Sequence, residues 1–297
     1  PDSICIERKS RFGSRWLPVT AAEFDKSIRR VAHGLLGVGV TPGESIAIFG
    51  ATSYEWSLLD MAALSVGIVV VPIYESDSAE QIRWILEDSN IRLTFADNSA
   101  HAELVESVRT DTLLPTMLMD EDGFAALYEA ADTVSEGTAL VQREAVTADT
   151  LATIIYTSGT TGRPKGVELT HGNMVFSTLT VLKHERAIIN EETSRVLLFL
   201  PLAHIMARIV FLYGVSGKGR IGHVANTNSL IADLQGFKPT ALLVVPRVLE
   251  KIYNAAEAKT GGGTKLKIFR WAVQVAVENS EKSHHGPVFR VKRALAN

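Results

Sequence analysis

The first third of the chain alternates helix and strand patterns in a regular order, and this alternation limits the folds it can adopt. Short, continuously apolar segments at residues 45–49, 68–73 and 93–96 are typical of strands buried on both faces. The segments between them have the apolar spacing of amphipathic helices. Elements that alternate at these lengths form βαβ units around a parallel sheet. The sequence therefore predicts an α/β fold of layered sheets, with mainly parallel strands and flanking helices.

Two capping boxes mark where predicted helices begin. Thr20 precedes Glu23 by three residues, and Ser78 precedes Gln81 by the same spacing. In each pair the two side chains can satisfy backbone N–H groups that the first helical turn leaves unpaired. We therefore expect one helix to begin just after each hydroxyl residue.

The pattern is less regular beyond residue 150. Further strands are expected at residues 151–156, 196–200 and 240–245, and a further helix at residues 265–282. The polar stretch 133–149 separates this part from the first third, and we interpret it as a linker or surface excursion. The sequence thus predicts two subdomains, residues 1–150 and residues 151–297.

Composition and charge exclude several classes of protein. The 297 residues include 30 basic and 33 acidic ones, evenly mixed, with a net charge of −3, so no basic face for nucleic acid is expected. The longest apolar run, 61–73, is shorter than the roughly 20 residues that span a bilayer, and no signal peptide is visible.

Because Cys5 is the single cysteine, no intrachain disulfide can form and a reducing cytoplasm is expected. Peripheral membrane contact and oligomerisation stay open, and the start at Pro1 rather than Met leads us to expect an upstream piece.

The most informative segment is residues 156–166, Tyr-Thr-Ser-Gly-Thr-Thr-Gly-Arg-Pro-Lys-Gly, at the end of a predicted buried strand. Glycines let the backbone approach an anion closely and direct successive N–H groups at it. Four hydroxyls add neutral donors, and Lys165 adds a compact positive charge suited to phosphate. The segment predicts a phosphate-binding turn.

The spacing excludes the Walker A loop of kinases and GTPases. Two residues separate Gly159 from Gly162, where that loop has four, and Gly166 follows Lys165 where that loop has Ser or Thr. Composition alone also fits a flexible Thr/Gly surface loop or a hairpin joining two strands. The complete eleven-residue string after a buried strand favours phosphate binding.

This string resembles the phosphate-binding signature of the adenylate-forming superfamily, which includes acyl-CoA synthetases, firefly-type luciferases and peptide-synthetase adenylation domains. Residues 166–173, Gly-Val-Glu-Leu-Thr-His-Gly-Asn, are similar to the strand and helix start that follow the loop in these proteins. Residues 200–205, Leu-Pro-Leu-Ala-His-Ile, resemble the next motif, which lines the acyl and adenylate pocket. Residues 245–251, Val-Pro-Arg-Val-Leu-Glu-Lys, resemble the long-chain fatty acid–CoA ligase branch. The resemblance covers nearly the whole chain and implies the incomplete large N-terminal domain of such an enzyme.

The resemblance implies a reaction in two steps. A fatty carboxylate attacks the α-phosphorus of ATP, and the thiol of CoA then displaces AMP from the acyl-AMP. The first step needs no general base, because a carboxyl group with a pKa of about 4 is already ionised at neutral pH. It needs charge neutralisation and in-line positioning instead.

The same resemblance assigns roles to residues of this chain. The implied ATP-binding residues are Thr157, Ser158, Gly159, Thr160, Thr161, Gly162 and Lys165. Thr157 would also help to hold Mg²⁺, and His204 would line the wall between the adenylate and the acyl chain. Arg208 and Arg247 are each open between an anion contact and a surface charge, and His171 is expected to begin a helix.

The sequence departs from the family in what it lacks. No Tyr-Gly-x-Thr-Glu string supplies a glutamate for Mg²⁺, no Thr-Gly-Asp segment supplies an aspartate for the ribose, and the small C-terminal lid domain with its lysine is absent. We therefore expect no catalytic residue within this chain. By itself it should bind ATP weakly or not at all and make no acyl-CoA.

Two alternatives to a CoA ligase stay open at this point. A fatty acyl-AMP ligase would pass the acyl group to a carrier-protein thiol; the passages around Leu200 and Val245 favour the CoA ligase. A non-catalytic nucleotide-binding module would keep the sheet without the chemistry, and the intact string with Lys165 argues against it. The acyl chain length is not specified by the sequence.

Overall fold

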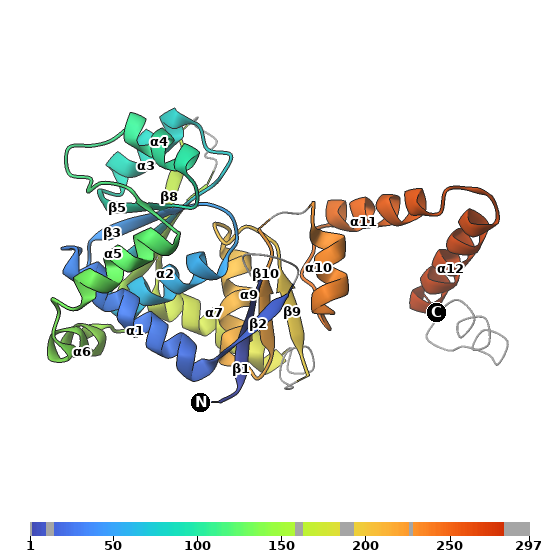
Figure 1. Ribbon diagram of the computed structural model, residues 1–297, viewed down its shortest axis with the longest axis horizontal. Coiled ribbons are helices and arrows are strands. Elements are labelled where there is room, and N and C mark those ends of the chain that lie inside the picture. Colours follow the sequence, from blue (N-terminus) through green and yellow to red (C-terminus); the bar gives the residue numbers. More distant parts are fainter. Residues whose placement is uncertain (1, 10–14, 158–162, 185–192, 226–227, 282–297) are drawn as a thin grey trace. The chain divides into compact units, whose positions relative to one another are not determined.

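The computed structural model describes residues 2–9, 15–157, 163–184, 193–225 and 228–281. The chain divides into two compact units, Pro1–Leu243 and Val244–Asn297. The first unit contains two sheets (Figure 1).

The larger sheet has six strands in the order β6-β5-β3-β4-β7-β8. Their bounds are Ser45–Phe49 for β3, Val69–Ile73 for β4, Ile91–Ala96 for β5, Met117–Leu118 for β6, Leu151–Thr157 for β7 and Lys165–Thr170 for β8. All neighbouring strands are parallel except β8, which runs antiparallel to β7. The predicted α/β fold with a mainly parallel sheet is confirmed.

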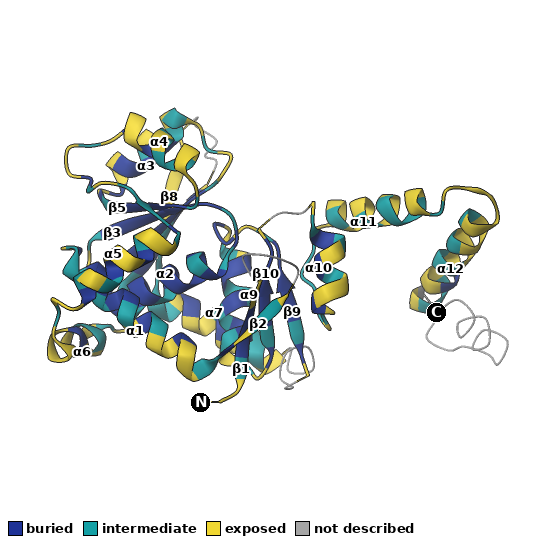
Figure 2. Cartoon of the chain, in the orientation of Figure 1, coloured by how far each residue is buried: buried dark blue, intermediate teal, exposed yellow. Residues whose placement is uncertain are grey.

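Side chains alternate between the two faces of this sheet because successive residues of a strand point in opposite directions. In β3, Ile46 and Ile48 join one buried cluster, while Ala47 and Phe49 join another. The first cluster includes residues of α1 (Ala21–Gly37), α2 (Tyr54–Ser65) and α5 (Glu121–Ala131). The second includes residues of α3 (Ala79–Asp88) and α4 (Ser99–Ser107). Figures 1 and 2 show these two helical layers and the buried sheet between them.

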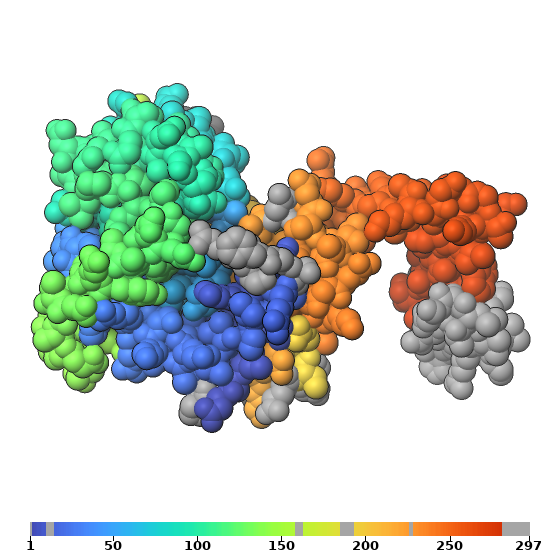
Figure 3. All heavy atoms as spheres, in the orientation of Figure 1, coloured from blue at the N-terminus to red at the C-terminus, as the bar shows by residue number. Residues whose placement is uncertain are grey.

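Helices α1 and α3 begin at the two capping boxes that the sequence predicts. The Thr20 and Ser78 side chains each accept from the backbone N–H three residues ahead, and Glu23 and Gln81 bond back to the cap residues. In the space-filling view, the atoms of the first part of the chain, coloured blue to green, lie against one another over one side of the view (Figure 3).

The smaller sheet has four strands in the order β2-β1-β10-β9. Their bounds are Ile4–Lys9 for β1, Trp16–Thr20 for β2, Arg195–Leu198 for β9 and Arg220–His223 for β10. Strand β1 pairs in parallel with β10, with Ile6 opposite Ile221. Both residues belong to the same buried cluster as Ile46 of the larger sheet and Phe211 of α9 (Ile205–Ser216). One apolar core therefore joins the two sheets.

Residue 150, the predicted boundary between two subdomains, lies directly before a strand of the larger sheet. Strand β7 begins at Leu151 and pairs with β4, where Thr153 lies opposite Val70. The two compact units of the chain divide after Leu243, and the two predicted subdomains stay a prediction. Residues 133–149, interpreted as a linker or surface excursion, include α6 (Glu136–Ala145), whose N-cap is Ser135.

The strand predicted at residues 240–245 does not form. One isolated bridge joins Ala241 to Val196. The amides of Thr240 and Ala241 both donate to the carbonyl of Arg195, at 2.8 and 3.2 Å. Two consecutive amides that share one acceptor do not follow the regular hydrogen-bond pattern of a strand pair. Val245 then caps α11.

The described residues of the first unit also form α7 (His171–His184) and α10 (Leu230–Phe237). The second unit contains α11 (Pro246–Lys259) and α12 (Gly263–Glu281), and α12 confirms the helix predicted at residues 265–282. The rings of Tyr253 and Phe269 lie 5.4 Å apart, and Arg270 pairs with Glu257 at 2.8 Å. Within the described ranges, no helix is both long and apolar enough to cross a bilayer.

Candidate active site

The candidate site lies at the carboxyl edge of the larger sheet, where β4 and β7 end side by side. Thr157 is the last residue of β7, and Tyr74 directly follows β4. Since the carboxyl ends of parallel strands meet at one edge of a sheet, ligands commonly bind there. A cavity of about 420 Å³ opens at this edge and is lined by Tyr74, Ser76, Asp77, Gln81, Ile85, Tyr156, Thr157, Pro164 and His204.

The predicted phosphate-binding segment forms the hairpin between β7 and β8. Thr157 lies directly opposite Lys165 in the antiparallel pair, and both residues are exposed. Ser158, Gly159, Thr160, Thr161 and Gly162 lie outside the described residues, so their predicted roles stay predictions. A hairpin and a phosphate-binding segment were two alternatives for this part of the sequence. The pairing of β7 with β8 shows that they do not exclude each other.

The stem of this hairpin is fixed to α3. The indole N–H of Trp84 donates to the carbonyl of Pro164 at 3.0 Å, and the Arg163 guanidinium lies 4.7 Å from the Trp84 ring centroid. The Tyr156 hydroxyl donates to Asp88 at 2.6 Å. Burial and this carboxylate raise the pKa of Tyr156, so the phenol stays protonated as a donor. Both ends of the loop are therefore anchored to the same helix.

Gly166 allows β8 to approach β7 closely. A Cβ atom at this position would lie 2.7 Å from Cγ2 of Ile154 and 3.2 Å from the Tyr156 ring. A side chain there would push the two strands apart directly after Lys165. The glycine therefore has a packing role in addition to its place in the motif.

His204 lies in the same cavity as Thr157. It caps the N-terminus of α9, but its side chain makes no capping hydrogen bond. Its Nδ1 atom lies 3.1 Å from the hydroxyl oxygen of Tyr74, and the two rings are 4.7 Å apart. Burial raises the pKa of Tyr74, so the protonated phenol can donate to Nδ1 and leave Nε2 for a ligand.

Tyr74 and Asp77 were not singled out in the sequence. Asp77 accepts from the backbone N–H of Tyr74 at 3.1 Å, and burial raises the pKa of its carboxyl group. A signal was present, because Tyr74 directly follows a predicted strand and such positions converge at the sheet edge.

A second, apolar cavity of about 260 Å³ adjoins Thr157. It is lined by Ile155, Thr157, Val167, Leu169, Asn173, Met174, Ser177, Ile205 and Ile209. Thr157 thus borders both cavities, the polar one and the apolar one. Lys165 is exposed near this point, and its ammonium group has no hydrogen-bond or ion-pair partner among the described residues.

The two arginines that were left open have different environments. Arg208 is buried in an ion pair with Asp60, so it is no surface charge and its fork is occupied. Arg247 lies on α11 in the second unit and is exposed. His171 is the first residue of α7, as predicted; burial lowers its pKa.

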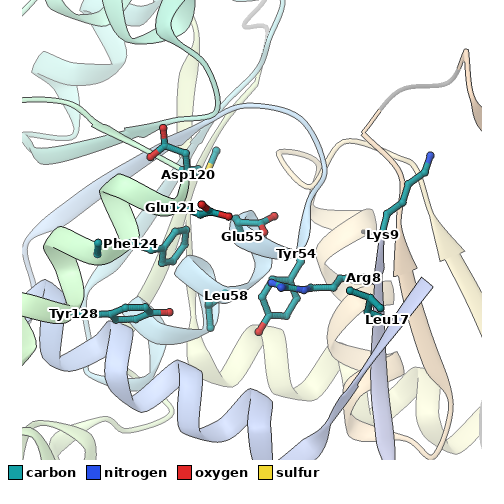
Figure 4. A pocket seen from close by; sticks show the side chains of 12 residues that line it. Arg8, Lys9, Leu17, Tyr54, Glu55, Leu58, Asp120, Glu121, Phe124 and Tyr128 are labelled. Atoms are coloured by element: carbon teal, nitrogen blue, oxygen red, sulfur yellow. The ribbon is translucent and has the colours of Figure 1, made fainter. Parts of the chain in front are cut away.

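Another cavity, of about 480 Å³, lies between β1, α2 and α5 (Figure 4). The Arg8 guanidinium lies over the Tyr54 ring, 5.5 Å from its centroid, and Phe124 and Tyr128 form the opposite wall. None of the residues predicted for ATP or acyl binding lines it. It is therefore not the site that the motifs describe.

The sequence model of AMP-binding enzymes matches residues 1–278. The chain belongs to this family. The resemblance to the adenylate-forming superfamily is thereby confirmed.

Curated relatives carry the name of the ligase branch. The chain is similar to the long-chain-fatty-acid–CoA ligase FadD15 of Mycobacterium tuberculosis, with 39% identity over 99% of this chain and 50% of the relative. It is also similar to long chain acyl-CoA synthetase 3 of Arabidopsis thaliana, with 30% identity over 89% of this chain and 42% of the relative. The chain thus spans about half the length of the curated relatives it matches.

Solved structures show the same fold. ATP-bound MatB from Rhodopseudomonas palustris superposes with a TM-score of 0.70 and 24% identity, over 85% of this chain and 49% of that one. The o-succinylbenzoate CoA synthetase of Bacillus subtilis, in complex with its acyl-adenylate intermediate, superposes with a TM-score of 0.67 and 25% identity, over 86% and 61%. The predicted N-terminal domain fold is confirmed by these likenesses.

The described residues do not by themselves make a Mg²⁺ site. They contain no group of three or more His, Cys, Asp or Glu side chains placed to hold a metal ion. Thr157 offers one neutral oxygen, and Asp77, the carboxylate of the 420 Å³ cavity, already accepts from a backbone N–H. Mg²⁺ usually binds through one or two carboxylates together with substrate phosphates, and among the described lining residues of this cavity Asp77 is the one carboxylate.

Proposed function

We propose that this chain forms the nucleotide- and acyl-facing part of a long-chain fatty acid–CoA ligase. The complete enzyme would convert a fatty acid and ATP to acyl-AMP and pyrophosphate, and then form acyl-CoA and AMP. The observation that carries the proposal is the meeting of Thr157, at the stem of the phosphate-binding segment, and His204 in one cavity. The two motifs lie far apart in the sequence and come together at one sheet edge.

The substrate class is supported by two further observations. The relatives at 39% and 30% identity are named as long-chain acyl-CoA ligases and synthetases. The apolar cavity beside Thr157, with Ile155, Met174 and Ile209 in its wall, offers an environment that favours a hydrocarbon chain. Thr157 would then lie where the carboxyl end of the chain meets the polyphosphate.

In the first step, a carboxylate oxygen bonds to the α-phosphorus while the bond to the pyrophosphate oxygen breaks. The carboxylate is already ionised, so positioning and charge neutralisation lower the barrier. Lys165, an exposed ammonium opposite Thr157 with no described partner, would neutralise the leaving phosphates. His204, held by Tyr74, would donate from Nε2 to the adenylate. In the second step the CoA thiol loses its proton and its sulfur bonds to the acyl carbon, while the bond between that carbon and the AMP phosphate oxygen breaks and AMP leaves.

The cytoplasm is the compartment we propose. Cys5, the single cysteine, is buried, and burial raises its pKa to about 11. A protonated, enclosed thiol has little reactivity and suits a reducing compartment.

The test is ATP-dependent pyrophosphate release with palmitate, using the complete native polypeptide that carries this chain. Lys165→Ala should lower the rate at least about tenfold, because a charged contact to phosphate is lost. Lys26→Ala, an exposed lysine on α1, is the matched control and should leave the rate unchanged. Absence of pyrophosphate release with any fatty acid would contradict the proposal.

The acceptor is tested in the same system. Acyl-CoA should form on addition of CoA. Acyl-AMP that accumulates with CoA but reacts with a carrier-protein thiol would instead support the acyl-AMP ligase. The isolated 297-residue chain is expected to give no turnover, since it spans about half the length of its relatives.

A further inference from the structure

Arg208 of α9 has the most enclosed ion pair in the described part of the chain. Its side chain is 1% exposed and that of Asp60, on α2, is 2% exposed. The guanidinium donates from Nε and Nη2 to the two carboxylate oxygens of Asp60, at 3.1 and 2.5 Å. Its Nη1 donates to the hydroxyl oxygen of Thr153, on β7, at 2.6 Å. One side chain therefore joins three elements.

Thr153 extends this network to a fourth element. Its hydroxyl accepts from Arg208 and donates to the carbonyl of Val70, on β4, at 2.5 Å. The groups from Asp60 to Val70 thus form one continuous chain of directional hydrogen bonds. Such a chain fixes relative positions more strictly than apolar contact does.

Each of three network members lies four residues from a residue that lines the candidate site. Val70 precedes Tyr74 along β4, and Thr153 precedes Thr157 along β7. On α9 the order is reversed: Arg208 follows His204 by one helical turn, and its backbone N–H donates to the His204 carbonyl at 3.3 Å. The network therefore ties together the three elements that deliver Tyr74, Thr157 and His204 to one cavity.

Stability alone gives a weak reason for such a pair. Removing two charges from water is costly, and well-packed apolar replacements of a buried pair are often equally stable or more stable. An apolar contact, however, would not fix the position of α9 along β7. What the charged network adds is the relative position of the elements.

We propose that Arg208 is a positioning residue for the adenylation step. It holds α9 against β7 and α2 so that His204, Tyr74 and Thr157 face one another across the cavity. The inference rests on the proposed function of that cavity.

The test replaces the whole pair, since Arg208→Met alone leaves Asp60 buried without a partner. The double variant Arg208→Met with Asp60→Leu should keep the thermal midpoint of the native protein. Its kcat for palmitate-dependent pyrophosphate release should fall at least about tenfold, because a misplacement of about 1 Å can cost roughly 10²-fold. The KM for ATP should change less than about threefold, since the phosphate-binding segment itself is intact.

Thr153→Val gives a second route to the same answer. It keeps the Asp60–Arg208 pair and the side-chain shape but removes the hydroxyl that links Arg208 to β7. We expect a several-fold lower kcat with an unchanged KM for ATP, and a smaller loss than in the double variant. This variant tests the positioning role even if the double variant does not fold.

The matched control is the other arginine pair, Arg195 with Glu7, in the smaller sheet. Arg195→Met with Glu7→Leu should shift the thermal midpoint but leave kcat and KM unchanged well below that midpoint. A wild-type kcat in the stable Arg208 and Asp60 double variant and in Thr153→Val would overturn the positioning role, as would an equal kcat loss in the control. Lack of pyrophosphate release by the native protein is a different result, which rejects the function of the cavity and the positioning role with it.

Discussion

The two sheets of the first unit each contain an arginine–carboxylate pair, in different surroundings. Arg208 and Asp60, against the larger sheet, are 1% and 2% exposed, and Arg208 is the one cationic partner of Asp60 among the described residues. Arg195 and Glu7, in the smaller sheet, are 23% and 9% exposed, with contacts of 2.7 and 2.8 Å. Glu7 also pairs with Arg220 at 3.1 Å.

The two ion pairs therefore have different roles. In the smaller sheet two arginines share one carboxylate near solvent, across strands β1, β10 and β9, and no site residue lies on those strands. In the larger sheet the pair connects elements that end at the candidate site. Changes in the smaller sheet should therefore alter stability alone, whereas changes around the larger one should alter activity as well.

The largest expected effect is on stability, from removing one arginine. Arg208→Met should lower the free energy of unfolding by about 3–5 kcal/mol, because Asp60 would remain buried without a partner. Arg195→Met should cost about 1–2 kcal/mol, since Glu7 keeps Arg220. Urea unfolding followed by tryptophan fluorescence measures both. Equal losses would remove the contrast between the two pairs.

The next effect concerns pH and lies in the smaller sheet. His223 on β10 is buried, with Nε2 2.8 Å from the Ser57 hydroxyl, and burial lowers its pKa to about 3. The unfolded chain, with a histidine pKa of about 6.5, binds the proton more readily. Stability is therefore lost as the pH falls from about 6.5 toward 3, by about 2 kcal/mol at pH 5.

The control for this prediction is His223→Gln, which can keep a hydrogen bond to Ser57 but does not titrate. Its unfolding free energy should fall by about 2 kcal/mol less than that of the native protein between pH 7.5 and 5. An identical pH dependence in the two proteins would show that His223 is not held neutral.

Gly166 in the larger sheet and Gly222 in the smaller sheet can be compared directly. An added Cβ would lie 2.7 Å from Ile154 at Gly166, and 2.6 Å from the Phe237 ring at Gly222 on β10. Each change to alanine should cost about 1–2 kcal/mol of overpacking. Only Gly166→Ala should also slow pyrophosphate release, because it displaces β8 directly after Lys165. Equal rates in the two variants would argue against a role for the hairpin.

The smallest expected effect comes from one hydroxyl. Tyr74→Phe removes the contact to Nδ1 of His204 and should change stability by less than about 1 kcal/mol. It should lower pyrophosphate release a few-fold, because His204 loses its orienting partner. Tyr128→Phe, in the cavity away from the motifs, is the control and should do neither. Matching rates for the two variants would exclude an orienting role for Tyr74.

The sequence predicted the larger sheet well because its signals are local. Continuous apolar runs predicted β3, β4 and β5, and the capping boxes predicted the starts of α1 and α3. The phosphate-binding string predicted a turn at the chain reversal between β7 and β8. The resemblance at residues 200–205 pointed to His204, whose role stays a prediction. By contrast, the strand expected at residues 240–245 fails because two amides converge on the Arg195 carbonyl, a contact that its own pattern does not contain.

The sequence by itself determined the βαβ alternation, the helix starts, the motif order and the family. Tertiary structure alone decided that β1 pairs with β10, that Tyr74 faces His204, and that Arg208 is enclosed rather than free. Periodicity and capping act within a few residues, so they are visible in any window of the chain. Pairings such as Glu7 with Arg195, 188 residues apart, form only when the whole core closes, since their energy comes from shared burial.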